Sequence, residues 1–343
     1  MQRNSYRITG VISLLIFTIL LSSCEKALMD RQTENNPVSN FESLWNTADQ
    51  KYSFFEYKGI DWNEVYDRYR PMISEQMADE ELFDVLAAML NELKDGHVNL
   101  VSPFNISRYA FNWYAPQNFD FRLLKDHYIG WDYKITGPLI NTRIEYQGKE
   151  FGYIYYGSFS DYVESADIDY VLGSFYNTDG LIFDIRNNGG GNVNNIYQLA
   201  SRFTDREIMV YKAAIKNGPG HEDFTEYEEV WLEPKGSHPY LKPVILLTNR
   251  SCFSAASFFT LAMRELSQVT VIGDTTGGGL GAPAGFELPN GWGYRFSTSR
   301  TITPSGQNFE NGIPPDHTVW MQPEHIAEGK DDILEAALLN LAK

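Results

Sequence analysis

The chain has 343 residues, a formal net charge of −17 at pH 7 and two cysteines, and 43% of its residues are hydrophobic. This length is enough for one large domain or two modest ones with a buried core. The acidic charge argues against nucleic-acid binding, because neutralising phosphates requires a basic surface. Two cysteines cannot supply a disulfide framework. Composition therefore predicts an acidic globular protein.

The first 24 residues differ from the rest of the chain. Arg3 and Arg7 precede an apolar run over residues 8–21. This run of about 14 residues is too short to cross a bilayer, which takes roughly 20 residues. A basic start followed by a short apolar run is instead typical of a signal peptide. The run ends in Leu21-Ser22-Ser23-Cys24, which resembles the signal of bacterial lipoproteins.

The lipoprotein resemblance implies cleavage before Cys24 and lipidation of its sulfur, and the alternative is an ordinary secretory signal with an incidental cysteine. Residues 1–23 contain two arginines and no acidic residue, so cleavage changes the net charge from −17 to −19. We expect a signal peptide at 1–23, a polar tether at 24–38 and a lipid-anchored location in the bacterial cell envelope, periplasmic or surface-exposed.

Residues 39–100 are predicted to form a helical region. Apolar residues recur at helical spacing from Phe41 onward, and Asp61 has the position of a second helix start. A third helix is expected over residues 79–93, with Asp79 as its cap. The aromatic-rich segment 101–150 is then expected to contain several short strands.

Residues 151–343 alternate between apolar runs and helical patterns. The expected strands are 151–159, 180–185, 243–247 and 269–272, and the expected helices are 193–203, 254–266 and 331–341. Strands that alternate with helices indicate crossover connections and a largely parallel sheet.

Three polar turns stand at the ends of these elements. His97 follows Asp95-Gly96 at a helix end, where a lone histidine is also compatible with a structural or exposed residue. The turn DIRNNGGG over 184–191 can present backbone N–H groups to a phosphate or an oxyanion, or can be a structural turn. It lacks the Walker lysine and the GxGxxG spacing. In TNRSCFSAAS over 248–257, a serine could be a helix cap or a nucleophile.

The order of these motifs is more specific than any one of them. DGH, DIRNNGGG, TNRSCFSAAS, VIGDTTGGG, LPNG and GIPPD follow one another along the chain. Together they resemble peptidase family S41, which includes carboxy-terminal processing proteases and the tricorn core. The resemblance covers residues 80–343 and is strongest over 151–320. It implies an α/β fold with a ClpP/crotonase-like core and a mostly parallel sheet, beside a small N-terminal helical domain.

The resemblance also implies serine peptidase activity of the tricorn type. The processing branch uses a lysine in the turn that corresponds to VIGDTTGGG, but the chain has no lysine between Lys242 and Lys330. By resemblance to the tricorn branch, Ser254 is the nucleophile, His97 the general base and Glu310 the residue that orients the imidazole. The oxyanion hole then corresponds to the backbone N–H groups of Gly189 or Gly190 and of Ala255.

The chain departs from the family pattern in two places, and two residues near Ser254 are alternative candidates for the nucleophile. Ser257 stands where the family often has glutamate, and the roughly 50 residues of 101–150 are too few for the PDZ domain of the processing branch. Cys252 is a stronger nucleophile than serine once ionised, although the alignment of motifs favours Ser254. Ser251 matches no catalytic position.

The remaining expectations concern cofactors and partners. The other histidines lack metal-ligand spacing, so neither a metal nor another cofactor is expected; they are His127, His221, His238, His317 and His325. The expected partners are a peptide or protein substrate and a membrane reached through the lipid anchor, with no nucleic acid. The oligomeric state stays open. The alternatives are a non-catalytic S41-like module that binds a peptide or an apolar ligand, and a structural lipoprotein.

Overall fold

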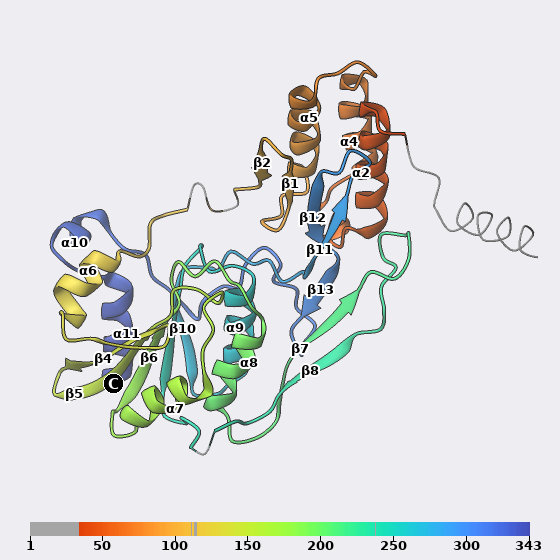
Figure 1. The fold of residues 1–343 in the computed structure, drawn as a ribbon. Coiled ribbons are helices and arrows are strands. Elements are labelled where there is room, and N and C mark those ends of the chain that lie inside the picture. The colour runs from red at the N-terminus through yellow and green to blue at the C-terminus, as the bar shows by residue number, and fades with distance from the viewer. Residues whose placement is uncertain (1–33, 111, 113–114, 237) are drawn as a thin grey trace, which may run out of the picture.

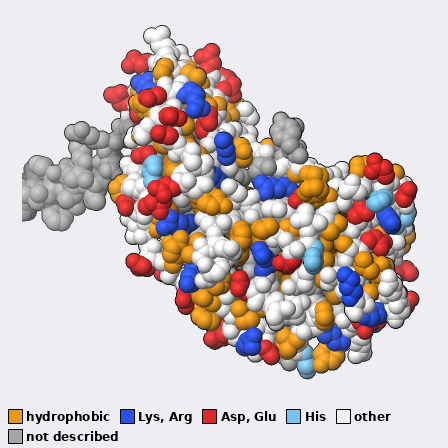
Figure 2. All heavy atoms as spheres, turned by 180° about the vertical axis from the view of Figure 1, so that it is seen from behind, with side chains coloured by type: hydrophobic (Ala, Val, Ile, Leu, Met, Phe, Trp, Pro, Cys, Tyr) orange, Lys and Arg blue, Asp and Glu red, His pale blue; other side chains and the backbone are white. Residues whose placement is uncertain are grey.

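The computed structural model describes residues 34–110, 112, 115–236 and 238–343. The expected signal peptide and Cys24 lie outside the described residues. Two lobes are visible in Figure 1, a helical lobe and a larger body built around a sheet. On the face shown in Figure 2, acidic side chains cover much of the helical lobe, and basic side chains lie where the two lobes meet.

The helical lobe is built mainly from three amphipathic helices. Its elements are α2 (Pro37–Lys51), α3 (Phe55–Lys58), α4 (Trp62–Tyr69), the 3-10 turn η1 (Arg70–Met72) and α5 (Asp79–Asn91). Asp61 caps α4 as predicted, because its carboxylate accepts from the N–H groups of Asn63 and Glu64. The predicted cap at Asp79 is wrong: Ala78 occupies that position, and Asp79 lies in the first turn, where its charge still favours the helix dipole.

A small antiparallel sheet completes the helical lobe. Its order is β11-β12-β1-β2, formed by β1 (Asn99–Val101), β2 (Ile106–Arg108), β11 (Pro283–Glu287) and β12 (Gly293–Ser297). Trp292 and Phe296 of the β11–β12 hairpin share one hydrophobic core with the helices. The predicted division into a helical region at 39–100 and a core at 151–343 is therefore incomplete, because the hairpin belongs with the helical lobe.

The body contains a seven-stranded, mostly parallel sheet. Its order is β14-β10-β9-β6-β5-β4-β3, and the five strands from β14 to β5 run parallel. The bounds are β3 (Lys134–Thr136), β4 (Leu139–Tyr146), β5 (Lys149–Tyr155), β6 (Gly180–Asp184), β9 (Val244–Thr248), β10 (Val269–Gly273) and β14 (His317–Thr318). The α/β fold with a mostly parallel sheet is thus confirmed.

Helices cover both faces of this sheet (Figure 1). Along β6, Leu181 and Phe183 face one hydrophobic core and Ile182 faces another, as alternation along a strand requires. On one side lie α7 (Ser165–Ser174), α8 (Asn194–Ala200), η3 (Ser201–Phe203) and α9 (Ala255–Arg264). On the other side lie α6 (Phe121–Leu124), η2 (Lys125–Ile129), α10 (Pro323–Ala327) and α11 (Asp332–Ala342).

A third sheet lies beside the junction of the two lobes. Its order is β13-β7-β8, with β7 (Ile208–Ile215), β8 (Glu228–Leu232) and β13 (Ser299–Ile302). Strand β13 follows β12 after one residue, so the chain passes directly from the helical lobe into this sheet. Among the helices of the described residues, none has both the length and the apolar character that a bilayer crossing needs.

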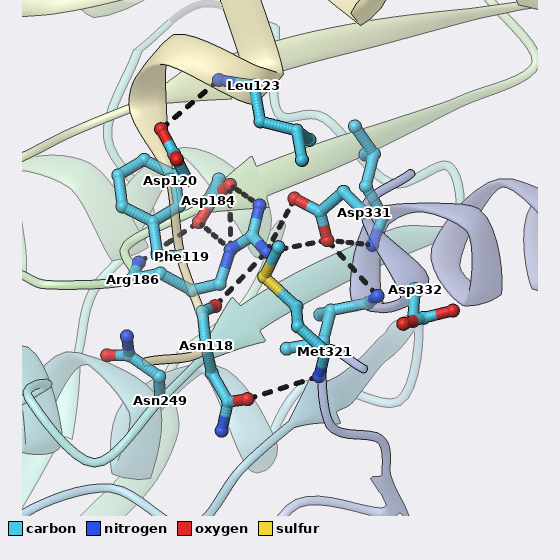
Figure 3. A network of polar contacts seen from close by, with 12 residues as sticks. Asn118, Phe119, Asp120, Leu123, Asp184, Arg186, Asn249, Met321, Asp331 and Asp332 are labelled. Atoms are coloured by element: carbon cyan, nitrogen blue, oxygen red, sulfur yellow. Dashed lines mark hydrogen bonds and ion pairs between the residues drawn. The ribbon is translucent and has the colours of Figure 1, made fainter. Parts of the chain in front are cut away.

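A buried ion network anchors the strand that leads into the glycine turn. The Arg186 side chain has no exposed surface and lies between two carboxylates (Figure 3). Its Nη2 is 2.6 Å from Asp184 Oδ2, and its Nη1 donates to Asp331 at 2.9 Å. The guanidinium also stacks over Phe119, with 4.8 Å from Cζ to the ring centroid. Asp331 caps α11, so the network fixes the end of β6 against this helix.

Replacing Arg186 with alanine should destabilise the fold strongly. Removing one member of a buried ion network leaves its partners charged and unpaired, which typically costs about 3–5 kcal/mol. We expect Arg186→Ala to lower the free energy of unfolding in urea by that amount. Arg143→Ala, which removes an exposed ion pair with Glu150 on the same sheet, should cost at most about 1 kcal/mol. Equal losses in the two variants would contradict the anchoring role.

Candidate active site

Ser254 lies in a strained turn between β9 and α9. Its backbone has φ 54° and ψ −119°, a conformation that side-chain-bearing residues rarely adopt. Its side chain makes no capping hydrogen bond to α9. The reading of Ser254 as a simple helix cap is therefore excluded, and its hydroxyl is free for another partner.

Two glycine turns hold the Ser254 turn in place. A Cβ on Gly190 would lie 2.5 Å from the carbonyl oxygen of Phe253 and 2.9 Å from the nitrogen of Ala255, so only glycine allows this approach. On the other side, the Ser254 N–H donates to the carbonyl of Gly278 at 3.0 Å. The backbone of the nucleophile turn is thus packed between the DIRNNGGG and VIGDTTGGG turns.

His97 reaches Ser254 from the helical lobe. Its Nε2 lies 3.0 Å from Ser254 Oγ, and the residue is only 5% exposed. The turn that presents His97 is closed locally, because its backbone N–H donates to Asp95 Oδ1 at 2.8 Å. The structure therefore brings together the two residues that the motifs singled out, although 157 positions separate them in the chain.

The second imidazole nitrogen contacts a serine. His97 Nδ1 lies 3.3 Å from Ser297 Oγ, and this hydroxyl is also 3.1 Å from the carbonyl oxygen of Gly281, to which it donates. With its proton directed to Gly281, Ser297 Oγ accepts from Nδ1–H. This arrangement favours the tautomer in which Nε2 is unprotonated and faces Ser254.

Asp95 is the carboxylate nearest the imidazole. Its Oδ1 lies 3.8 Å from His97 Nδ1, it is 1% exposed, and its Oδ2 has no hydrogen-bond partner among the described residues. Burial lowers the pKa of His97 below its ordinary value, while the negative charge of Asp95 acts in the opposite direction. Burial thus disfavours the charged form of the imidazole, and Asp95 favours it.

Glu310, which was expected to orient the imidazole, makes no direct hydrogen bond to His97 among the described residues. Glu310 Oε2 instead accepts from the backbone N–H groups of Leu280 and Gly281, at 2.7 and 3.0 Å. Its other oxygen lies 3.9 Å from Nζ of Lys58, which comes from the helical lobe. Burial raises the pKa of Glu310, and the nearby Asp95 adds to this rise. Within the part of the chain that the structure describes, Glu310 is linked to His97 through the Gly281 backbone and Ser297.

The three expected oxyanion donors differ in whether their N–H groups already have a hydrogen-bond acceptor. The N–H of Gly190 donates to Asn188 Oδ1 at 3.0 Å, so the expectation for this group is corrected. The N–H groups of Gly189 and Ala255 have no acceptor among the described residues. Ala255 is also the first residue of α9, where the helix dipole favours negative charge.

Cys252 and Ser257, the neighbours of Ser254, contribute to the packing of the turn. Cys252 is fully buried, its Sγ lies 3.0 Å from the carbonyl oxygen of Ile185, and burial raises the pKa of its thiol to about 12. A thiol that stays protonated and inaccessible is a poor nucleophile. Ser257, which replaces the family's glutamate, lies 3.1 Å from Thr276 Oγ1 and so links α9 to the VIGDTTGGG turn.

The remaining histidines do not gather into a metal site. His221 pairs with Asp49, and His325 pairs with Asp332. Within the described parts of the chain, no group of three or more histidine, cysteine, aspartate or glutamate side chains is arranged to hold a metal ion.

Ser254 and His97 open into a large cleft between the lobes. The cleft has a volume of about 1190 Å³ and extends from the small sheet of the helical lobe to the β13-β7-β8 sheet. Its lining includes the aromatic side chains of Tyr197, Tyr211 and Phe258. Such a cleft is large enough for an extended peptide.

Sequence reasoning missed three residues of this cluster. Asp95 was visible in the DGH motif, where its place beside His97 was a usable signal. Ser297 and Lys58 carried no local signal, because Ser297 ends a strand of the hairpin and Lys58 ends a one-turn helix. Ser297 comes near His97 through the pairing of β12 with β1 inside the helical lobe, whereas Lys58 reaches Glu310 through the packing of the helical lobe against the body.

Comparisons with known proteins identify the family. A model of peptidase family S41 matches residues 150–319, and a model of the tricorn protease C1 domain matches residues 34–91. The carboxy-terminal processing protease CtpB of Bacillus subtilis is 24% identical over 186 residues, which cover 53% of this chain and 36% of that protein. The chain thus spans little more than a third of the length of this relative.

Solved structures extend the similarity over most of the chain. A candidate peptidase from Parabacteroides merdae is 44% identical, with a TM-score of 0.86, over 90% of this chain and 98% of that one. Mature CPAF has a TM-score of 0.68 at 13% identity, over 89% and 98% of the two chains, which shows a shared fold alone. The chain belongs to peptidase family S41, a family of serine hydrolases.

Proposed function

We propose that this chain is a serine peptidase in which Ser254 is the nucleophile and His97 the general base. The observation that carries the proposal is the 3.0 Å contact between His97 Nε2 and Ser254 Oγ at the wall of a large cleft. The strained backbone of Ser254 supports the same role, because strain of this kind concentrates at functional sites.

The proposed reaction follows from these contacts. His97 Nε2 takes the hydroxyl proton as Ser254 Oγ attacks the carbonyl carbon of the scissile bond. The N–H groups of Gly189 and Ala255 stabilise the resulting oxyanion. The imidazolium then gives its proton to the leaving amine, the C–N bond breaks, and an acyl-enzyme remains. Water, deprotonated by His97, hydrolyses this ester and restores Ser254.

Two groups support the imidazole during this reaction. Ser297 holds the required tautomer, and the charge of Asp95, 3.8 Å from Nδ1, stabilises the imidazolium once it forms. In this proposal Glu310 is a positioning residue, because its carboxylate fixes the Leu280–Gly281 backbone. The substrate class is peptide or protein.

The proposed location is the cell envelope, with Cys24 as the lipid attachment site. The support is the N-terminal sequence alone, a basic start and a short apolar run that ends in LSSC. The expected tether, residues 24–38, would then join the lipid to the folded part, and α2 already begins within it, at Pro37.

Labelling with a fluorophosphonate tests the nucleophile. We expect the wild-type chain to be labelled, and Ser254→Ala and His97→Ala to lose labelling, because the probe needs an activated serine. Hydrolysis of peptide substrates should fall on the order of 10⁶-fold in both variants. The control is Cys252→Ala, which should keep its label.

Three outcomes separate the readings. Labelling that persists in both the serine and the histidine variants would contradict the assignment. Loss of labelling only in Cys252→Ala would identify the thiol as the nucleophile. A wild-type chain that folds and binds peptides but neither reacts with the probe nor cleaves them would favour the non-catalytic module.

The pH profile tests the role of Asp95. His97 must be neutral to act as a base, and burial lowers its pKa. On the acidic side, kcat/KM should therefore begin to fall only below pH 6.5, the ordinary pKa of histidine. Asp95 raises the pKa of His97, so Asp95→Asn should move the acidic limb to still lower pH. The same change should reduce kcat on the order of 10²–10³-fold, because the imidazolium loses a charge at about 4 Å. An acidic limb that does not move would contradict this role.

Metabolic labelling with palmitate tests the anchor. In a bacterial host, the full chain should incorporate the label and sediment with membranes, and Cys24→Ser should do neither. Cys252→Ser is the matched control and should behave like the wild type. Membrane association that survives in unlabelled Cys24→Ser would contradict a lipid anchor at this residue.

A further inference from the structure

The side chain of Lys58 is buried where the two lobes meet. Lys58 is the last residue of the one-turn helix α3, and its side chain is only 5% exposed. Its ammonium nitrogen lies 5.7 Å from the ring centroid of Phe54 and 5.9 Å from that of Tyr52. Aromatic rings attract a cation, but burying a charge costs free energy unless polar partners compensate it. The polar groups around this nitrogen therefore have to stabilise its charge.

The polar partners of Lys58 lie in two different segments of the site. Its Nζ donates to the carbonyl of Lys94 at 2.9 Å, and Lys94 directly precedes the Asp95-Gly96-His97 turn. The same nitrogen lies 3.9 Å from Glu310 Oε1 in the body. Among the described residues, Lys58 is the one cation within ion-pair distance of that carboxyl group. Lys58 thus connects the turn of the general base to Glu310.

These contacts close a ring around the imidazole. His97 Nδ1 faces Ser297 Oγ, which donates to the carbonyl of Gly281. The N–H of Gly281 donates to Glu310 Oε2, and the other oxygen of Glu310 faces Lys58. Lys58 completes the ring through the carbonyl that it contacts at the start of the His97 turn. Without Lys58 the ring would be open between Glu310 and that turn.

The charge of Lys58 also acts on the imidazole. Burial lowers the pKa of His97 and the carboxylate of Asp95 raises it, while the positive charges of Arg295 and Lys58 lower it. For Glu310, burial and the nearby Asp95 raise the pKa, and Lys58 acts against this rise. Lys58 therefore favours the neutral imidazole that a general base requires.

We propose that Lys58 is a positioning residue for His97, because its buried ammonium group ties the catalytic turn to Glu310. The inference rests on the proposed function, in which His97 is the base that activates Ser254. Lys58 acts through the orientation and the basicity of the imidazole. Since Lys58 and Glu310 come from different lobes, this contact makes the geometry of the base depend on the packing of the lobes.

Replacing Lys58 with methionine tests this role. Methionine keeps an unbranched side chain beside the rings of Phe54 and Tyr52, but it removes the charge and the hydrogen bond to Lys94. We expect Lys58→Met to lower the rate of fluorophosphonate labelling on the order of 10- to 100-fold, because a displaced catalytic group is costly. The rate is measured across the pH range in which the enzyme stays folded.

The pH profile separates this role from a purely structural one. Loss of the positive charge raises the pKa of His97, so the acidic limb of the labelling rate should move to higher pH by roughly 0.5 unit. This direction is opposite to that expected for Asp95→Asn. Lys58→Gln keeps a donor for the Lys94 carbonyl without the charge and should show the same shift. Lys58→Arg keeps the charge and should keep the limb in place.

Tyr57→Phe is the matched control. Tyr57 precedes Lys58 in α3, and its hydroxyl donates to the carbonyl of Asn308 at 3.3 Å across the same junction. The variant thus removes a neighbouring contact between the lobes without removing a charge. Its labelling rate should stay within about 2-fold of the wild type, and its acidic limb should not move.

The two proposals fail in different ways. An acidic limb that stays at the wild-type pH in both Lys58→Met and Lys58→Gln would overturn the positioning role while leaving the peptidase proposal intact. So would a limb that moves equally in Tyr57→Phe. Absence of labelling in the wild-type chain would overturn the peptidase and with it this inference. Urea unfolding of each variant establishes that the rates compare folded proteins, and Lys58→Gln decides the question where Lys58→Met is too unstable to assay.

Discussion

The strained backbone at Ser254 is the constraint on which the site depends. A residue with a side chain adopts φ 54° together with ψ −119° only where its surroundings enforce it, at a cost of about 1–3 kcal/mol. Here the enforcement comes from close backbone contact, with Gly190 on one side and the carbonyl of Gly278 on the other. The same contacts bring the exposed N–H of Gly189 to the wall of the cleft. The glycine turns therefore both enforce the strained backbone of Ser254 and place an N–H group for the oxyanion.

The site is assembled from both lobes. The body supplies Ser254 and the glycine turns, and the helical lobe supplies His97 together with its neighbours Asp95 and Ser297. Because the β11–β12 hairpin leaves the body, joins the helical lobe and returns through β13, the two lobes share chain as well as surface. A change in the packing of the lobes would alter the distance from His97 to Ser254 before it altered either turn.

The sequence patterns correctly predicted those features that depend on residues close together in the chain. The buried strands around β6 and β9, the cap at Asp61 and the polar turns at the strand ends were all readable, since apolar runs and turn residues act over a few positions. The pairing of β12 with β1 was not readable, because it joins segments about 200 residues apart. Ser297 and Lys58 were missed for the same reason. The motif singled out Glu310, but it could not show that this side chain contacts the Leu280–Gly281 backbone, because a motif records identity and not orientation.

A crystal structure of the fluorophosphonate adduct tests the central claim most directly. The account predicts a phosphorus–oxygen bond to Ser254 Oγ, with the phosphoryl oxygen accepting from the N–H groups of Gly189 and Ala255 and His97 Nε2 within hydrogen-bond distance of the adduct. A bond to any other residue would contradict the assembled site. So would a phosphoryl oxygen that accepts from neither of the two N–H groups.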